Sequence, residues 1–376
     1  MNALPPPAGG PVATTGAVRI VGTGLLGASI GLGLRQLGVD VVLHDPSRTT
    51  MLLARDVGAG RLPARDDSPP RLVIVAAPPD VTGEVVATEL DTQPQAVVTD
   101  VASVKCAVVQ VLESKRADLS RYVGSHPMAG SERSGPTASR PDLFAGRPWV
   151  VVPTAASTPE AVLAVRDLVT DLGATPVLLE ARAHDDAMAL ISHLPQVAAS
   201  LVGARLRDAD PAALDLAGQG LRDVTRIAAS DPGLWTSILA ANAGAVLPLL
   251  RAVGADLAGL IASLEHAASD AGVVPDGALG AVAALIAAGN VGVDRIPGKH
   301  GGTRRAYDVV TALVPDEPGA LARLLTDVGA AGINLEELGI EHAPWQPVGL
   351  AAISVLRGLG PQLQEALTTR GWRVAG

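Results

Sequence analysis

Two histidines of this chain stand where a side chain could move a proton. His126 follows a short apolar run directly, in the segment 124–130, and His193 lies in 192–196, inside a predicted helix. Histidine suits proton transfer because its ordinary pKa lies near neutral pH. Spacing alone does not show that either histidine is catalytic, because a hydrogen-bonded structural histidine is the commoner outcome. Both residues remain candidates.

The remaining histidines are predicted to have ordinary surroundings. His44 is expected at the rim of a strand end. Solvated side chains are expected for the others, which are His184, His266, His300 and His342.

A pair of arginines offers a possible anion clamp. Arg222 and Arg226 are four residues apart and share one face of a predicted helix, with Asp223 beside the first. An arginine can grip a carboxylate with two parallel hydrogen bonds. A solvated ion-pair face, worth a few tenths of a kcal/mol, explains the same spacing. The spacing does not decide between the two interpretations.

Three glycines in G-x-G-x-x-G spacing predict a dinucleotide site. Gly22, Gly24 and Gly27 follow an apolar run and open a helical stretch, and a second apolar run then leads to Asp45. In such a loop the first glycine allows a tight turn, the second lets the backbone approach a pyrophosphate, and the third lets helix and strand pack closely. The helix N-terminus favours phosphate charge. Strand, helix, strand and acid in register make a dinucleotide site much better supported than a structural turn.

The acid at the end of the second strand favours NAD over NADP. Asp45 can accept hydrogen bonds from both ribose hydroxyls, and its carboxylate would repel a 2′-phosphate. Arg48 nearby could partly offset that repulsion, so NADP remains the alternative.

Further apolar runs continue a doubly wound α/β pattern and place polar segments at strand ends. The expected strands are 71–76, 96–99, 122–125, 149–152 and 175–179, the last two closing the sheet. Ligands of open parallel sheets bind beyond the carboxyl ends of the strands. One crevice is therefore expected between the ends at 22–27, 77–79, 100–103 and 125–130. The predicted cofactor-binding residues are Gly22, Gly24, Leu25, Leu26, Gly27, Asp45, Ala77 and Pro78.

The periodicity of apolar residues divides the chain. A disordered tail is expected over 1–16, a dinucleotide-binding Rossmann domain over 17–182 and an all-helical domain over 183–295, where Pro195 should kink the helix beside His193. A Gly/Pro-rich linker over 296–305 precedes a ferredoxin-like βαββαβ pattern over 306–376. Close packing of the Ala-rich helices is expected, including packing against a second subunit.

Composition bounds the partners and the compartment. A length of 376 residues accommodates two or three domains, and the net charge of −9 without a basic run argues against nucleic acid or an anionic membrane as partner. The single cysteine, Cys106, fits a reducing cytosol and is expected to be a small buried side chain. The N-terminus lacks the features of a signal peptide, and the apolar stretch 279–288 is too short to span a bilayer. A cytoplasmic protein without a metal site is predicted.

Taken together, the motifs resemble the prephenate/arogenate dehydrogenase family of tyrosine biosynthesis. The matching segments are VGTGLLGASIGLGL, TDVASVK, GSHPMAGSERSG, SHLPQ and GLRDVTRIAASDPGLW, which occur in family order between about Val18 and Trp235. The C-terminal region is similar to an ACT domain, a small ligand-binding regulatory module, at Pro318–Ala320 and Gly332–Asn334.

The resemblance implies a reaction and roles for individual residues. Hydride would pass from a cyclohexadienyl substrate to NAD(P)⁺ while the ring carboxylate leaves as CO2. His126 would be the base or hydrogen-bond acceptor for the 4-hydroxyl, and Ser103 would orient His126 and the nicotinamide. Arg226 would bind a substrate carboxylate, and His193 would line the site. Glu132 and Arg133 would border or gate the pocket.

The resemblance also implies regulation and assembly, and it leaves alternatives. Tyrosine is the expected effector of the ACT-like domain, and a homodimer is expected. Prephenate is the leading substrate, and arogenate is the nearest alternative. A β-hydroxyacid-type dehydrogenase would place a catalytic lysine in the helical domain, but no lysine occurs from Val150 to Gly298. A non-catalytic sensor of dinucleotide and amino acid would have no need of His126, Ser103 and Arg226.

Overall fold

The computed structural model describes residues 12–130, 134–269, 278–298, 306–342 and 347–375. The chain divides into two compact units, one of Met1–Ala198 with Ile227–Arg251 and one of Ala199–Arg226 with Ala252–Gly376.

The first unit begins with a four-stranded parallel sheet in the order β2-β1-β3-β4. Its strands are β1 (Val18–Val21), β2 (Val41–His44), β3 (Leu72–Val75) and β4 (Val97–Asp100). The helices that alternate with these strands are α1 (Leu25–Gln36), α2 (Arg48–Asp56), α3 (Pro79–Thr92) and α4 (Cys106–Ser114). This is the βα alternation that the sequence predicts.

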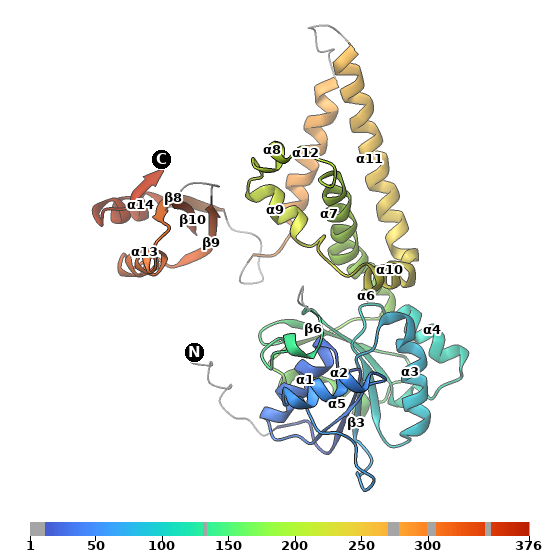
Figure 1. Ribbon diagram of the computed structural model, residues 1–376. Helices are drawn as coiled ribbons and strands as arrows, with labels where there is room; N and C mark the ends of the chain where they lie inside the picture. Colours follow the sequence, from blue (N-terminus) through green and yellow to red (C-terminus); the bar gives the residue numbers. More distant parts are fainter. Residues whose placement is uncertain (1–11, 131–133, 270–277, 299–305, 343–346, 376) are drawn as a thin grey trace. The chain divides into compact units, whose positions relative to one another are not determined.

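Both faces of the sheet are covered by helices. In β3, Leu72 and Ile74 join a core shared with α1 and with α5 (Pro159–Asp171), whereas Val73 and Val75 join a separate core shared with α3 and α4. Figure 1 shows α3 and α4 in cyan on one side of the strands. A strand buried on both faces needs an unbroken apolar run, and this explains why the run in β3 has no polar interruption.

The sequence predicts that the later strands extend the parallel sheet, but the structure places them in a second sheet. They form a three-stranded sheet in the order β5-β6-β7, in which β5 pairs antiparallel with β6. The strands are β5 (Val123–Pro127), β6 (Pro148–Pro153) and β7 (Thr175–Leu178). A parallel pair needs a helical crossover, and the described residues between β5 and β6 hold only the short 3₁₀ turn Pro136–Ala138. A parallel bridge, Val98 to Tyr122, joins the two sheets.

The predicted tail packs onto this unit at its described end. The backbone N–H groups of Ala13 and Thr14 donate to the carboxylate of Asp171, and Thr14 is buried. Residues 1–11 lie outside the described residues. The prediction of disorder over 1–16 is therefore wrong for 12–16, because the acidic end of α5 binds the backbone there.

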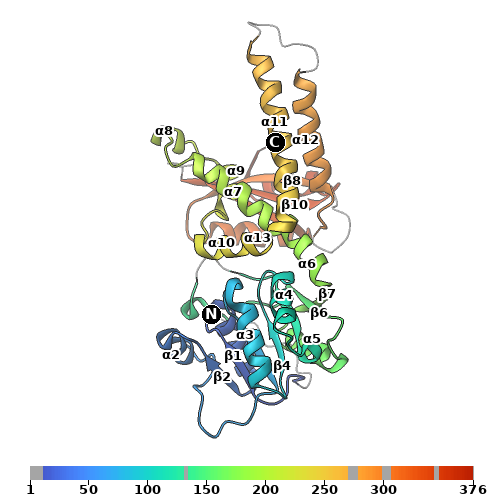
Figure 2. The same cartoon turned by 90° about the vertical axis from the view of Figure 1, so that its right-hand side faces the viewer.

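The described residues between 181 and 294 are mostly helical, as the sequence predicts. The helices are α6 (Ala181–Met188), α7 (Leu194–Arg205), α8 (Pro211–Leu214), α9 (Gln219–Arg226), α10 (Pro232–Ala241), α11 (Ala243–Ser269) and α12 (Ala278–Asp294). A π-helical turn, Ala189–His193, joins α6 to α7 just before Pro195. Proline lacks the N–H that an α-helix would use there, and the irregular turn lies where the sequence predicts a kink. Figure 2 shows α11 as one long rod.

The C-terminal part has the element order βαββαβ. Its elements are β8 (Tyr307–Pro315), α13 (Ala320–Ala330), β9 (Leu335–His342), β10 (Val348–Leu356), α14 (Gly360–Thr369) and β11 (Arg373–Ala375). The antiparallel sheet has the order β11-β8-β10-β9. Alternate residues such as Val310, Ile353 and Val355 face a core that α13 and α14 share. Most of the predicted linker, 299–305, lies outside the described residues.

Candidate active site

The glycine loop has the geometry that a bound dinucleotide requires. Gly22 has a φ of +95°, and a Cβ there would lie 2.3 Å from the carbonyl oxygen of Ala76. A Cβ on Gly27 would lie 2.0 Å from the carbonyl oxygen of Gly22, whereas nothing lies within 4 Å of a Cβ on Gly24. Gly24 is also the N-cap of α1 and supplies no side-chain cap. The first and third glycines are thus demanded by packing, and the second leaves open space at a helix N-terminus.

Asp45 holds the glycine loop in place. Its Oδ2 accepts hydrogen bonds from the backbone N–H of Thr23 at 2.7 Å and from the Thr23 hydroxyl at 3.0 Å, and its Oδ1 accepts from the N–H of Ser47. The carboxylate therefore lies against the loop at the end of β2. Leu25 and Leu26 begin α1, and Ala77 and Pro78 follow β3, so all the predicted cofactor-binding residues lie at the same edge of the parallel sheet.

A buried charge cluster lies at the carboxyl end of β4. Lys105 is fully buried, and its ammonium group donates to the Asp100 carboxylate and, at 2.8 Å, to the carbonyl oxygen of Ser125. The Tyr122 hydroxyl donates to the other oxygen of Asp100 at 2.7 Å. Burial lowers the pKa of Lys105 against the opposing charge of Asp100, and burial also raises the pKa of Tyr122. The cluster joins the start of α4 to β5, one residue before His126.

His126 lies at the carboxyl end of β5 and is partly buried. Its Nδ1 lies 3.0 Å from Nε2 of His184. Burial, reinforced by the charge of the Lys105 ammonium group, holds the pKa of His126 well below its usual range. A neutral imidazole near neutral pH is the state in which histidine can accept a proton.

His184 is buried, although the sequence analysis predicts a solvated side chain. Its Nδ1 lies 2.8 Å from Oδ1 of Asp185, and its ring meets that of His126 edge to face, with centroids 5.2 Å apart. Both residues lie in α6, which packs against α4 and β6. The sequence feature that could have indicated a buried His184 is the adjacent Asp185, on the helix that leads to His193. The prediction fails because α6 faces the sheet rather than the solvent.

His193 is buried on the π-helical turn. Its Nδ1 lies 3.1 Å from Nδ2 of Asn242, which also donates to the backbone carbonyl of Asp185 at 2.8 Å. The ring meets Trp235 edge to face at 6.0 Å. Asn242 therefore links His193 to the residue that contacts His184, and it is not among the predicted site residues.

The remaining predicted residues lie on other elements. Ser103 is half-buried in the loop between β4 and α4. Arg226 ends α9 in the second unit, and on that helix Asp223 accepts a hydrogen bond from Gln219. Glu132 and Arg133 lie outside the described residues. Cys106 is partly rather than fully buried, and burial raises its pKa to about 12.

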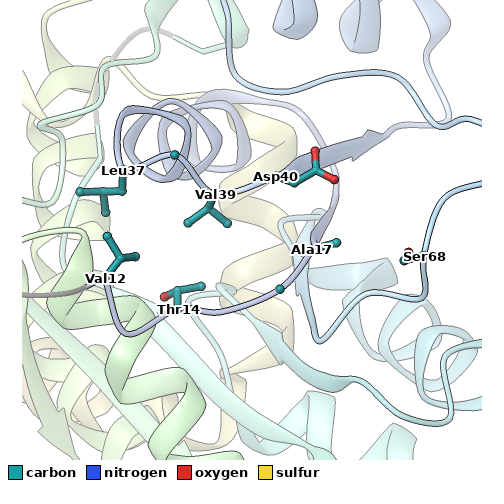
Figure 3. Close-up of a pocket in the computed structure, with 9 residues that line it drawn as sticks. Val12, Thr14, Ala17, Leu37, Val39, Asp40 and Ser68 are labelled. Carbon is teal, nitrogen blue, oxygen red and sulfur yellow. The ribbon is translucent and has the colours of Figure 1, made fainter.

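A separate pocket of about 590 Å³ lies at the opposite end of the strands (Figure 3). Val12, Leu37 and Val39 line it beside the carboxylate of Asp40, which is already bound by Arg61 at 2.8 Å. Ligands of open α/β sheets bind at the carboxyl ends of the strands. This pocket lies beside the amino ends of β1 and β2, so it is not the dinucleotide site.

Comparison with known proteins identifies the family. The model of the prephenate dehydrogenase nucleotide-binding domain matches residues 30–178, and that of the prephenate dehydrogenase dimerization domain matches residues 180–273. A probable prephenate dehydrogenase, NovF of Streptomyces niveus, is 39% identical over 360 residues, which cover 94% of this chain and 98% of the relative.

Solved structures agree with these matches. Prephenate dehydrogenase of Aquifex aeolicus, in complex with hydroxyphenyl propionate and NAD⁺, has a TM-score of 0.62 at 26% identity and covers 74% of this chain and 99% of its own. Arogenate dehydrogenase of Synechocystis has a TM-score of 0.56 at 28% identity and covers 66% of this chain and 92% of its own. With the two family models spanning the Rossmann-like and helical regions, the chain belongs to the prephenate dehydrogenase family.

Proposed function

We propose that this chain is an NAD⁺-dependent prephenate dehydrogenase that forms 4-hydroxyphenylpyruvate and CO2 on the route to tyrosine. The observation that carries the proposal is His126, a partly buried imidazole with a depressed pKa at the carboxyl end of β5, in a chain of this family. The relative of Streptomyces niveus, which matches over 94% of this chain, supports the same activity.

The glycine loop and Asp45 are the proposed cofactor site. The open space at Gly24 fits a pyrophosphate against the uncapped N-terminus of α1. The carboxylate of Asp45 favours the ribose hydroxyls of NAD over the 2′-phosphate of NADP. When bound, NAD⁺ supplies the hydride acceptor.

His126 manages the hydroxyl proton in the proposed mechanism. Its Nε2 accepts the proton of the 4-hydroxyl as hydride leaves the same ring carbon. The electron pair of the bond to the departing CO2 then enters the ring, and the proton returns to the new phenolate oxygen. No net proton is released, because His126 gives the proton it accepted back to the product and is again neutral at the end of the cycle. Aromatisation drives the step, and the protein mainly orients the substrate.

The remaining site residues have proposed roles in binding. Ser103 orients His126 and the nicotinamide from the loop after β4. Arg226 binds a substrate carboxylate, and His193 lines the site near the substrate side chain.

We propose a soluble, cytoplasmic homodimer. Along α11 an apolar stripe at 253, 257, 261 and 264 is exposed in the single chain, with Leu257 53% exposed. Two helices, Ala181–Arg205 and Ala243–Ala268, are long and apolar enough to cross a membrane by length and composition, and neither includes the apolar stretch 279–288. Both lie within the match to the dimerization domain, and a second subunit explains their exposed apolar faces.

The C-terminal region is the proposed regulatory module. Its strand order and βαββαβ connectivity support an ACT-like, ferredoxin-like fold. Tyrosine is the proposed effector, and it would inhibit the enzyme that supplies its precursor.

The test is NADH formation with purified protein, offering prephenate and arogenate separately, each with NAD⁺ and NADP⁺. Turnover of prephenate with NAD⁺ is expected, and added tyrosine should lower that rate. The second candidate, arogenate dehydrogenase, is favoured by the likeness to the Synechocystis structure, and a higher kcat/KM for arogenate would select it. Binding of NAD⁺ and tyrosine without turnover of either substrate would select the sensor alternative.

A further inference from the structure

A chain of three side chains leads from a buried carboxylate to the proposed base. Oδ1 of Asp185 lies 2.8 Å from Nδ1 of His184, and Nε2 of His184 lies 3.0 Å from Nδ1 of His126. Asp185 and His184 are buried, whereas His126 is partly buried. The chain therefore runs from the interior toward the strand end at which the proposed reaction takes place.

The carboxylate at the inner end is held in its ionised form. Asp185 accepts hydrogen bonds at 2.8 Å from the backbone N–H groups of Lys105 and Cys106, at the N-terminus of α4. Burial opposes ionisation, but the hydrogen bonds from His184 and from these two N–H groups outweigh it, and the pKa of Asp185 lies below its ordinary value. The positive end of the helix dipole adds to this preference.

An ionised Asp185 fixes the proton positions along the chain. The carboxylate can only accept, so Nδ1 of His184 carries a proton. In a neutral His184, Nε2 is then an acceptor, and the proton between the two histidines belongs to Nδ1 of His126. Nε2 of His126 is left with a lone pair, which is the atom that the proposed mechanism needs as a base.

The charges that face His126 are consistent with this arrangement. Lys105 is paired with Asp100, and Tyr122 donates to the same carboxylate. His193 lies in hydrogen-bond contact with the side chain of Asn242. Among the charged groups that act on His126, Asp185 is the one that raises the pKa of its imidazole. When His126 takes up a proton, this charge stabilises the imidazolium through His184.

We propose that His184 and Asp185 are positioning residues that hold His126 in the tautomer protonated at Nδ1 and stabilise the cation it forms during turnover. The proposal rests on the proposed function for its catalytic consequence. The proton still moves only between the substrate hydroxyl and Nε2 of His126, and neither His184 nor Asp185 touches the substrate.

A first experiment reads the tautomer without activity. Imidazole nitrogen shifts of the full-length protein labelled with ¹⁵N-histidine would be recorded at neutral pH and assigned with His126→Asn and His184→Gln. A protonated Nδ1 and an unprotonated Nε2 are expected for His126, with Nδ1 protonated in His184. A doubly protonated His184 beside a His126 protonated at Nε2 would overturn the proposal, because His126 would then be a donor.

A second experiment reads the catalytic consequence. Asp185→Asn and His184→Gln should lower kcat about 10- to 100-fold, less than the loss expected from removing the base itself, with the KM of substrate nearly unchanged. Asp185→Asn should also move the acid limb of the kcat/KM profile to lower pH, because the imidazolium loses its counter-charge. His266→Asn, at an exposed position of α11, is the matched control and should behave like the unmodified protein.

The outcomes separate this proposal from the proposed function. His184→Gln leaves the hydrogen bonds of Asp185 to α4 in place. It therefore tests the positioning of His126 even if Asp185→Asn does not fold. A folded His184→Gln with unchanged kcat and pH profile would overturn the proposal while the function stood. If the unmodified protein turned over neither substrate, the proposed function would fail, and the nitrogen shifts would still decide the tautomer.

Discussion

The ammonium group of Lys105 donates a hydrogen bond to the carbonyl of Ser125 at 2.8 Å, and so ties the start of α4 to the residue before His126. The same group neutralises Asp100, which is fully buried. The position of the proposed base thus depends on a buried ion pair that itself never reaches the substrate.

Replacing Lys105 by methionine should destabilise the protein strongly. Lys105→Met leaves the buried Asp100 without its counter-charge, and breaking a buried pair typically costs about 3–5 kcal/mol of the free energy of unfolding. Lys115→Met is the matched control, because Lys115 pairs with Glu84 in solvent, where the expected cost is below about 1 kcal/mol. Urea unfolding of both variants measures the difference, and equal midpoints would contradict it.

Replacing His126 by asparagine should remove the base without disturbing the cofactor site. We expect kcat to fall roughly 10²- to 10⁴-fold, as is typical for loss of a general base. The affinity for NAD⁺, measured by calorimetry, should hardly change, because the glycine loop lies on other strands. An undiminished rate would exclude His126 as the base.

Two glycines of the loop should respond differently to alanine. Gly27→Ala places a Cβ 2.0 Å from a backbone oxygen, so it should lower both the Tm and the affinity for NAD⁺. Gly24→Ala meets no protein atom within 4 Å, so it should keep the Tm and lower only the affinity. Thermal unfolding with and without NAD⁺ reads both effects. Unchanged affinity in Gly24→Ala would argue against pyrophosphate binding at this loop.

The two arginines of α9 give a matched pair for the substrate carboxylate. Arg226→Ala should raise the KM for prephenate about 10- to 100-fold, the equivalent of losing a charge-assisted hydrogen bond. Arg222→Ala, one turn earlier on the same helix, should leave KM within about twofold. Steady-state kinetics of the two variants measures both KM values. A KM for prephenate that Arg226→Ala changes no more than Arg222→Ala does would argue against carboxylate binding by Arg226.

The sequence predicts the local elements better than it predicts how they meet. Glycine spacing and apolar runs suffice for β1, α1 and β2, because backbone sterics and strand burial act locally. The antiparallel pairing of β5 with β6 and the burial of His184 depend instead on contacts between segments about 20 to 60 residues apart. His184 looked exposed because its neighbours Arg182 and Asp186 are polar and solvated. No single-helix pattern carries the information that α6 faces the sheet at that residue.

Acidification should destabilise the protein before its carboxylates titrate. Burial lowers the pKa of His44 from 6.5 to about 4, and burial also lowers the pKa values of His126 and His193. An unfolded chain binds protons at these histidines as the pH falls below 6.5, whereas the folded chain does not, so the free energy of unfolding falls with pH in this window. Each group adds a slope of at most about 1.4 kcal/mol per pH unit. The carboxylates with lowered pKa values, such as Asp40 and Asp185, lose their contribution only below the ordinary carboxyl pKa of 3.8.

Urea unfolding across the window from pH 6.5 to about 4 measures this slope. His44→Gln should make the slope shallower, because one of the neutral histidines with a lowered pKa is gone, and His266→Asn at an exposed site of α11 should leave it unchanged. A free energy of unfolding that stayed constant across the window would mean that the folded protein protonates these histidines as readily as the unfolded chain. Protonation of His126 at such pH values would then also remove the base, and the rate would fall together with the stability.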